Sequence, residues 1–173
     1  MQEAVTKDPR RQLQGQRSRE SGKLFEQRLD RSFEYMRHTG AAIIEKTPEP
    51  MKPLSRPNKY GQFKACFTKQ AQPDYKGVQK GGRMLVYEAK FTSKDRIEQD
   101  RVTETQAEYL NEYEKMEARC FIIVGFMSGA VYRVPWYVWN NMKGCYGRKY
   151  ATETDLKSYR VGESWNGTLY LLP

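Results

Sequence analysis

The chain has 173 residues, of which 30 are Lys or Arg and 21 are Asp or Glu, so its formal net charge is +9. For a chain of this length we expect one domain, long enough to bury a sizeable core without disulfides or structural metals. The positive charge predicts an anionic partner, and nucleic acid fits better than a membrane surface because no basic helix with a clean apolar face is evident. No apolar run approaches the roughly 20 residues that span a bilayer, and the polar N-terminus is not typical of a signal peptide.

The cysteines and the single histidine limit the chemistry further. Cys66, Cys120 and Cys145 are far apart and lack C-x-x-C spacing, so we interpret them as reduced intracellular thiols rather than zinc ligands or disulfides. His38 is the only histidine, which excludes a paired-histidine metal site. No G-x-S-x-G motif accompanies it, so we expect a polar residue near a helix end and not a catalytic triad.

Residues 1–20 are polar and rich in Gln and Arg. They offer almost no apolar side chains to bury, so we expect a disordered basic N-terminal arm. Contact with DNA phosphates and a solubilising role are equally compatible with this composition.

Apolar residues at helical spacing predict a helix over residues 21–39, with Gly40 as its stop. These residues are Leu24, Phe25, Leu29, Phe33 and Met36. Glu26 lies at the edge of this stripe. Periodicity alone favours a surface carboxylate paired with a neighbouring arginine, and the alternative is an acidic residue directed at a metal site.

The next stretch combines prolines with basic residues. Residues 41–44 predict a short buried strand, and the prolines that follow forbid regular helix and predict an extended or protruding segment, which we place at 51–70. From Lys46 to Arg83, nine basic residues accompany two acidic ones, and this concentration predicts phosphate contacts. The candidate DNA-binding residues are Lys46, Lys52, Arg56, Lys59, Lys64, Lys69, Lys76 and Lys80.

Aromatic residues are interleaved with these basic residues. Tyr60, Phe63 and Phe67 could stack on exposed bases. For Phe63 and Phe67, packing in the core of a strand is an equally good interpretation.

Residues 73–90 hold the candidate catalytic chemistry. Asp74 follows a proline, and Glu88 and Lys90 follow the apolar run 84–87, where strand alternation points both side chains to one face. Glycines between Asp74 and this strand predict a hairpin that returns Asp74 to the side of Glu88. Two carboxylates with an ammonium beside them suit metal-assisted phosphodiester hydrolysis, with Lys90 positioning water or balancing negative charge. An edge strand with an exposed Glu/Lys pair is the plainer alternative, and the Pro-Asp, the glycines and the apolar run weigh against it.

The second half of the chain predicts further elements. Residues 92–99 are expected to form a loop or short turn, 103–116 a helix with Gln106 near its start, 118–126 a buried strand and 130–134 its hairpin partner. An aromatic helix beginning at Pro135, with core or dimer-surface residues, a short helix at 152–157 and a strand at 169–172 complete the chain. The order of elements predicts an α/β fold with a central mixed sheet flanked by helices.

The arrangement of Asp74 and the run Glu88-Ala89-Lys90, after a helix that carries Glu26, resembles the PD-(D/E)XK nuclease superfamily. Within it, the chain is similar to the RecU-type Holliday junction resolvases of Gram-positive bacteria and their phages. The matching motifs span roughly residues 20–140, and residues beyond about 140 match weakly. They are Gly22-Lys23-Leu24-Phe25-Glu26, Ile44-Glu45-Lys46-Thr47-Pro48-Glu49-Pro50, Pro73-Asp74-Tyr75-Lys76-Gly77, Tyr87-Glu88-Ala89-Lys90, Thr105-Gln106 and Cys120-Phe121-Ile122-Ile123.

The resemblance implies a restriction-endonuclease-like fold, with residues 21–173 as a single nuclease domain and 51–70 as a stalk that projects into the junction centre. It implies Mg²⁺ or Mn²⁺ held by Asp74, Glu88 and the carbonyl of Ala89. Lys90 would be the catalytic lysine, and Glu26 and Gln106 further participants. Thr47 departs from the family pattern, which often has a second basic residue there.

The resemblance also implies the partners, which are four-way junction DNA and a second copy of the chain, so that two active sites nick two opposed strands. Recombinases or branch-migration proteins are candidate further partners, no membrane is expected, and the location is the cytoplasm, or the host cytoplasm for a phage protein. Two alternatives stay open. One is a nuclease of the same superfamily that acts on linear or damaged DNA, and the other is a junction-binding recombination protein without catalysis.

Overall fold

The structure is a computed structural model that describes residues 9–48, 50–67 and 72–173. A five-stranded sheet with the order β1-β4-β5-β7-β8 forms its centre. Its members are β1 (Ala42–Lys46), β4 (Tyr75–Gln79), β5 (Met84–Thr92), β7 (Arg119–Phe126) and β8 (Val131–Pro135). β5 and β7 run parallel and the other neighbours antiparallel, so the sheet is mixed and the expected α/β class is confirmed.

The helix α1 (Pro9–His38) covers one face of this sheet. Phe25, Leu29 and Phe33 are buried against Tyr87 and the other residues of that face. Gly125 of β7 allows the close approach, because a Cβ there would lie 2.7 Å from the Phe25 ring. Leu24, which we expected in the apolar stripe, is 65% exposed, since it lies one position off the face that meets the sheet.

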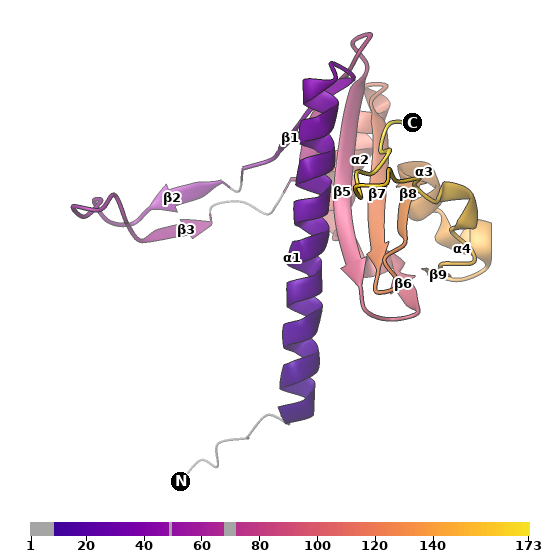
Figure 1. Ribbon diagram of the computed structural model, residues 1–173, viewed down its shortest axis with the longest axis horizontal. Helices are drawn as coiled ribbons and strands as arrows, with labels where there is room; N and C mark the ends of the chain where they lie inside the picture. Colours follow the sequence, from indigo (N-terminus) through magenta and orange to yellow (C-terminus); the bar gives the residue numbers. More distant parts are fainter. Residues whose placement is uncertain (1–8, 49, 68–71) are drawn as a thin grey trace.

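α1 begins at Pro9 and not at Ser21, so residues 9–20, for which we expected disorder, are helical and extend past the end of the sheet in Figure 1. Arg, Gln and Glu are good helix formers, and a helix already nucleated on the core extends at little cost. Proline is also favoured at a first helical position. Residues 1–8 of the expected arm lie outside the described residues.

The opposite face of the sheet is covered by α2 (Glu104–Lys115) and by the C-terminal helices. These are α3 (Trp136–Asn140) and α4 (Met142–Tyr146). Trp136 and Trp139 are buried with Leu110 in a second core cluster, so the aromatic helix contributes to the core, whereas Tyr137 is 64% exposed. The helix expected at 103–116 is confirmed as α2, with Thr103 as its N-cap.

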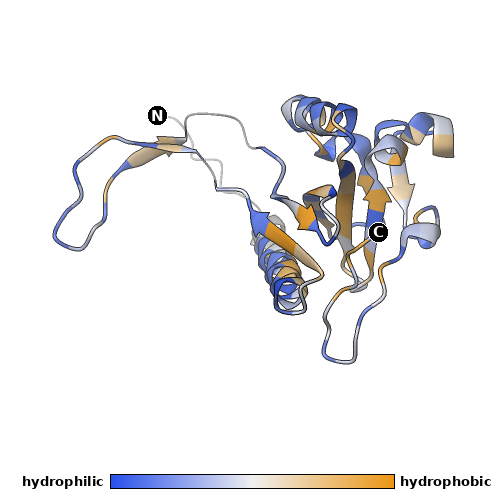
Figure 2. Ribbon diagram, turned by 90° about the horizontal axis from the view of Figure 1, so that it is seen from above, coloured by the Kyte–Doolittle hydropathy of each residue, from blue (hydrophilic) through white to orange (hydrophobic). Residues whose placement is uncertain are grey.

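Residues 51–67 form a separate hairpin of β2 (Met51–Pro53) and β3 (Ala65–Phe67). It projects away from the sheet, and its tip is mostly hydrophilic (Figures 1 and 2). Tyr60 is 74% exposed and Phe63 47% exposed, so packing of Phe63 in a strand core is wrong. The side chain of Phe67 lies outside the described residues.

Four local predictions differ from the structure. The segment 41–44 belongs to β1, an edge strand on which Ile43 is 52% exposed. The expected loop at 92–99 contains β6 (Arg96–Glu98). This strand pairs with β9 (Tyr150–Thr152), which ends at the residue where we expected a short helix, 152–157, to begin. The 3-10 helices η1 (Gln99–Arg101) and η2 (Lys157–Tyr159) follow these two strands. The expected strand at 169–172 is reduced to one isolated bridge, between Glu163 and Leu169.

The three cysteines are free thiols, and His38 lies in the last turn of α1 beside Glu34. Across the described residues, no helix has both the length and the apolar character that a membrane crossing requires.

Candidate active site

The hairpin of β4 and β5 brings the two central carboxylates together. Tyr75 lies opposite Tyr87 in this register, so Asp74, which directly precedes β4, lies beside Glu88. The backbone N–H of Asp74 donates to Oε2 of Glu88 at 3.3 Å, and the backbone N–H of Ala89 donates to Oδ2 of Asp74 at 2.8 Å. The turn is closed by Gly81 and Gly82 at φ of 97° and 88°, a region that glycine adopts without strain.

Lys90 and Gln106 complete a hydrogen-bonded cluster around Glu88. Nζ of Lys90 lies 2.6 Å from Oε1 of Glu88, and Nε2 of Gln106 donates to the same oxygen at 2.7 Å. Lys90 also donates to Oε1 of Gln106 at 3.2 Å. The Glu88 side chain is 1% exposed and that of Lys90 is 14% exposed, so this is a buried ion pair and the plainer interpretation of an exposed Glu/Lys pair is wrong.

The carboxylates have raised pKa values because they are buried. Burial raises the pKa of Glu88 to about 7, although the charge of Lys90 acts to lower it. Burial likewise raises the pKa of Asp74, against the lowering effects of the Ala89 N–H and Lys90. Because two buried carboxylates lie beside one ammonium, further positive charge would favour their ionised forms.

Glu26 lies in a second, more exposed group that adjoins the first. Its Oε2 is 2.7 Å from Nζ of Lys46, and both side chains are 51% exposed. The hydroxyl of Tyr75 donates to Asp30 at 2.7 Å, and Asp30 is one helical turn from Glu26 on α1. Burial is the main cause of the raised pKa of Asp74, and the Glu26 carboxylate adds to it, so the two groups lie within electrostatic reach.

Asp30 and Tyr75 were not found by the sequence analysis. The spacing of four residues between Glu26 and Asp30 is the signal that could have found Asp30, because residues i and i+4 lie on one helix face. Tyr75 directly follows Asp74, but its contact with α1 depends on how the helix crosses the sheet, which periodicity does not report.

The donor set fits a hard cation that keeps part of its water shell. Within the described residues no cluster of three or more His, Cys, Asp or Glu side chains could enclose a metal ion. Asp74 and Glu88, with the carbonyl of Ala89, instead offer two carboxylates and a backbone oxygen. Mg²⁺ commonly binds through one or two carboxylates and completes its octahedron with water and phosphate oxygens, so these residues fit Mg²⁺ or Mn²⁺ better than a closed Zn²⁺ cage.

The candidate DNA-binding residues do not form one continuous group. Lys52, Arg56, Lys59 and Lys64 lie on the hairpin of β2 and β3, where all four are exposed. Lys46 is paired with Glu26, and Lys76 is half-buried with Nζ 5.9 Å from the centre of the Tyr113 ring. Lys80 lies at the end of β4 remote from Asp74, and Lys69 lies outside the described residues.

Comparison with known proteins identifies the family of the chain. The family model described as "Recombination protein U" (RecU) matches residues 20–162. The chain is 29% identical over 144 residues to the Holliday junction resolvase RecU of Bacillus pumilus strain SAFR-032. This alignment covers 78% of this chain and 69% of that protein.

Among solved structures, the chain is similar to Hjc, a Holliday junction resolvase of Archaeoglobus fulgidus. The TM-score is 0.47 at 12% identity, and the match covers 80% of this chain and 88% of Hjc. The family match extends over most of the chain and includes Glu26, Asp74, Glu88, Lys90 and Gln106. This protein therefore belongs to the Recombination protein U (RecU) family.

Proposed function

We propose that this chain is a metal-dependent, structure-selective endonuclease that resolves Holliday junctions by paired symmetric nicks, in homologous recombination and DNA repair. The observation that carries the proposal is the buried Asp74–Glu88 pair, held by Lys90 and Gln106. The relative in Bacillus pumilus, which is named a Holliday junction resolvase, supports the choice of substrate. We expect the protein to act in the cytoplasm, where its DNA substrate would lie.

Asp74, Glu88 and the carbonyl of Ala89 would hold Mg²⁺ or Mn²⁺. When bound, the metal supplies Lewis acidity, which lowers the pKa of a bound water and neutralises charge on the phosphate. Glu88 must then be ionised, and the donors of Lys90 and Gln106 on its Oε1 favour that form and fix its orientation.

Lys90 is a cationic side chain in direct contact with Glu88. Its Nζ contacts Glu88 and Gln106, which hold the ammonium in one place beside the carboxylates that would hold the metal. We assign Lys90 the role of balancing the negative charge that develops as water attacks phosphorus. Glu26 would contribute from the adjoining group once a DNA phosphate competes for Lys46.

Paired nicks require two active sites on a two-fold symmetric substrate. The described residues of one chain contain one such carboxylate pair, so we propose that the active enzyme is a homodimer. The basic hairpin of β2 and β3, which projects from the body of the protein, is the element we assign to the junction centre.

The proposal is tested by cleavage of a labelled four-way junction beside a duplex of the same arm sequence, with Mg²⁺ and with EDTA. We expect symmetric nicks in the junction alone, and only with metal. Equal cutting of both substrates would leave a nuclease that acts on linear DNA, and tight junction binding without cutting would leave a non-catalytic recombination protein.

Asp74→Asn is the matched variant for this test. It removes one metal ligand and one negative charge with little change in volume. We expect it to abolish cleavage and to retain or tighten junction binding, and a loss of both together would indicate that Asp74 acts in folding.

A further inference from the structure

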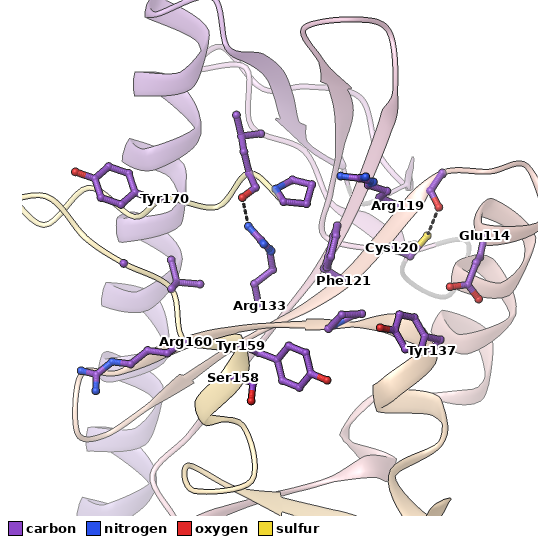
Figure 3. Close-up of a pocket in the computed structure, with 16 residues that line it drawn as sticks. Glu114, Arg119, Cys120, Phe121, Arg133, Tyr137, Ser158, Tyr159, Arg160 and Tyr170 are labelled. Carbon is purple, nitrogen blue, oxygen red and sulfur yellow. Dashed lines mark hydrogen bonds between the residues drawn. The ribbon is translucent and has the colours of Figure 1, made fainter. Parts of the chain in front are cut away.

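A cavity of about 620 Å³ lies at the start of β7 (Figure 3), and neither Asp74 nor Glu88 contributes to its lining. Its walls come from β7 and β8, from η2 and the residues after it, and from the C-terminal segment near Leu172, with single residues from α2 and α3. Phe121, on its floor, belongs to the same core cluster as Tyr87, whereas strand alternation points Glu88 to the opposite face of the sheet. The cavity is therefore separate from the candidate active site, and its volume is typical of ligand sites in proteins.

Most of the cavity wall is aromatic or aliphatic. Tyr137 and Tyr170 are 64% and 56% exposed and stand on opposite sides of the opening, with Tyr159 between them (Figure 3). Exposed aromatic residues around a concavity are typical of surfaces that bind a partner's apolar side chain.

Arginines supply the charge of this cavity. Arg119, Arg133 and Arg160 contribute to the lining, against one carboxylate from a side chain, that of Glu114. Among the described residues, the side chains of Arg119 and Arg160 make no hydrogen bond or ion pair. The cavity thus holds more positive charge than its own residues neutralise.

Arg133 is the most deeply placed of the three. Its guanidinium lies 5.3 Å from the centre of the Phe121 ring, and one terminal nitrogen donates to the carbonyl of Leu172. Its Nε is buried without a hydrogen-bond partner among the described residues. Burial lowers the pKa of Arg133, and the nearby charge of Arg119 adds to this effect. An anion that entered the cavity would relieve the repulsion between the two guanidinium groups.

We propose that this cavity is a docking site for an acidic protein segment, in which a carboxylate binds Arg119 and Arg133 and a neighbouring apolar or aromatic side chain packs on Phe121 and the tyrosines. Carboxylates match the fork of a guanidinium in two parallel hydrogen bonds. The apolar walls require a second, apolar group beside the anion.

A DNA duplex fits this site less well than a peptide does. Its phosphates lie on a convex surface, whereas Arg133 is recessed and half-buried. The basic hairpin of β2 and β3 also projects beyond the β1 edge of the sheet, as Figure 1 shows, whereas β8 beside the cavity is the opposite edge strand. A protruding peptide side chain can therefore enter the cavity while DNA occupies the β1 edge.

The test uses the full-length protein and fluorescein-labelled synthetic peptides. One peptide alternates Asp and Glu with Ile and Phe, a second replaces its acids with Asn and Gln, and a third replaces its apolar residues with Ser. By fluorescence anisotropy we expect saturable binding of the first peptide and at least tenfold weaker binding of the other two.

Two variants assign the binding to the cavity. Arg119→Gln removes an exposed guanidinium, and Arg133→Met removes the charge while keeping an apolar stem of similar length. We expect each substitution to lower the affinity for the acidic apolar peptide about tenfold. The matched control is Arg101→Gln on η1, an exposed arginine outside the cavity, which should leave the affinity unchanged. Junction cleavage and thermal unfolding of Arg119→Gln should match those of the wild type.

Each remaining outcome overturns the proposal. If no peptide binds the folded wild type, the cavity is not a docking site for an acidic segment. If Arg101→Gln weakens peptide binding as much as Arg119→Gln does, the peptide is attracted by the net charge of the protein and not by the cavity. If the cavity variants change the sedimentation coefficient, the cavity is an interface between copies of the chain. If they weaken junction binding in proportion to peptide binding, it is a nucleic-acid contact.

Discussion

Gln106 donates through Nε2 to Oε1 of Glu88 at 2.7 Å while its own Oε1 accepts the backbone N–H of Thr103 at 3.1 Å. The same side chain therefore caps α2 and fixes the carboxylate that we propose as catalytic. The Thr103 hydroxyl completes the capping box by accepting the backbone N–H of Gln106 at 3.3 Å. The start of α2 is thus tied directly to β5, the strand that carries the candidate active site.

Gln106→Glu separates these two roles. Glutamate is as good as glutamine in a capping box, so α2 should keep its N-terminus, but the donor to Glu88 is lost and a carboxylate takes its place. We expect cleavage at neutral pH to fall at least tenfold, because a charged hydrogen bond is removed and the pKa of Glu88 rises further. The pH at which the cleavage rate reaches half of its maximum should therefore be higher in the variant than in the wild type. Junction cleavage across pH 6–9, with circular dichroism as a check of helix content, measures both effects.

Gln106→Ala is the comparison, because it removes the cap and the donor together. If Gln106→Glu cleaves at the wild-type rate and only Gln106→Ala is impaired, Gln106 acts solely on helix stability.

The hairpin and its carboxylates could be predicted from sequence because their signals are local. Gly81 and Gly82 adopt the positive φ that a tight return requires, and alternation along β5 points Glu88 and Lys90 to one side. The pairing of β6 with β9 could not be predicted, since it joins segments about fifty residues apart. The contact of Asp30 with Tyr75 depends likewise on the crossing of α1 over the sheet, which no local pattern encodes.

The buried carboxylate also predicts a pH-dependent stability of the metal-free protein. Burial raises the pKa of Glu88 from 4.5 in the unfolded chain to about 7, so the folded state binds more protons between these values. The free energy of unfolding therefore contains a contribution that is fully present below about pH 4.5 and is lost as the pH rises through about 7. Its size is at most about 3–4 kcal/mol, at about 1.4 kcal/mol for each pKa unit.

Glu88→Gln removes this contribution and serves as the reference. Urea unfolding of both proteins in EDTA at pH 5 and pH 8 should show the wild type losing stability relative to the variant at the higher pH. A difference between the two proteins that is the same at both pH values would show that Glu88 ionises as in water.

Metal binding should reverse this pH dependence. Because the carboxylates must be ionised to bind Mg²⁺, the rise in melting temperature caused by Mg²⁺ should be larger at pH 8 than at pH 5. Asp74→Asn should show little rise at either pH. If Mg²⁺ still raises the melting temperature of Asp74→Asn, the metal binds somewhere other than this carboxylate pair.

Lys46 and Lys80 lie at opposite ends of the β1–β4 pair and allow a matched comparison. Lys46→Ala removes a cation beside the active site and leaves Glu26 without its partner, while Lys80→Ala removes the same charge far from Asp74. We expect Lys46→Ala to weaken junction binding several-fold and Lys80→Ala to have a smaller effect. The slope of log affinity against log salt concentration should become shallower by about one in Lys46→Ala. Stability should change by less than about 1 kcal/mol, because the Lys46–Glu26 pair is exposed. Equal losses in the two variants would mean that DNA follows the whole length of β4.

The hairpin of β2 and β3 should distinguish four-way from linear DNA. Its exposed residues include Tyr60 and Phe63 as well as the basic side chains, and it makes a two-stranded sheet of its own, so its removal should leave the central sheet intact. We expect replacement of residues 51–70 by a short Gly/Ser linker to weaken junction binding more than duplex binding, because only a junction presents an open centre into which the hairpin can project. Gel-shift titrations of both DNAs, with circular dichroism to confirm the fold, measure the two affinities. Equal losses on both substrates would reduce the hairpin to a general phosphate contact, and the choice between junction and duplex would then have to come from the spacing of two active sites in the dimer.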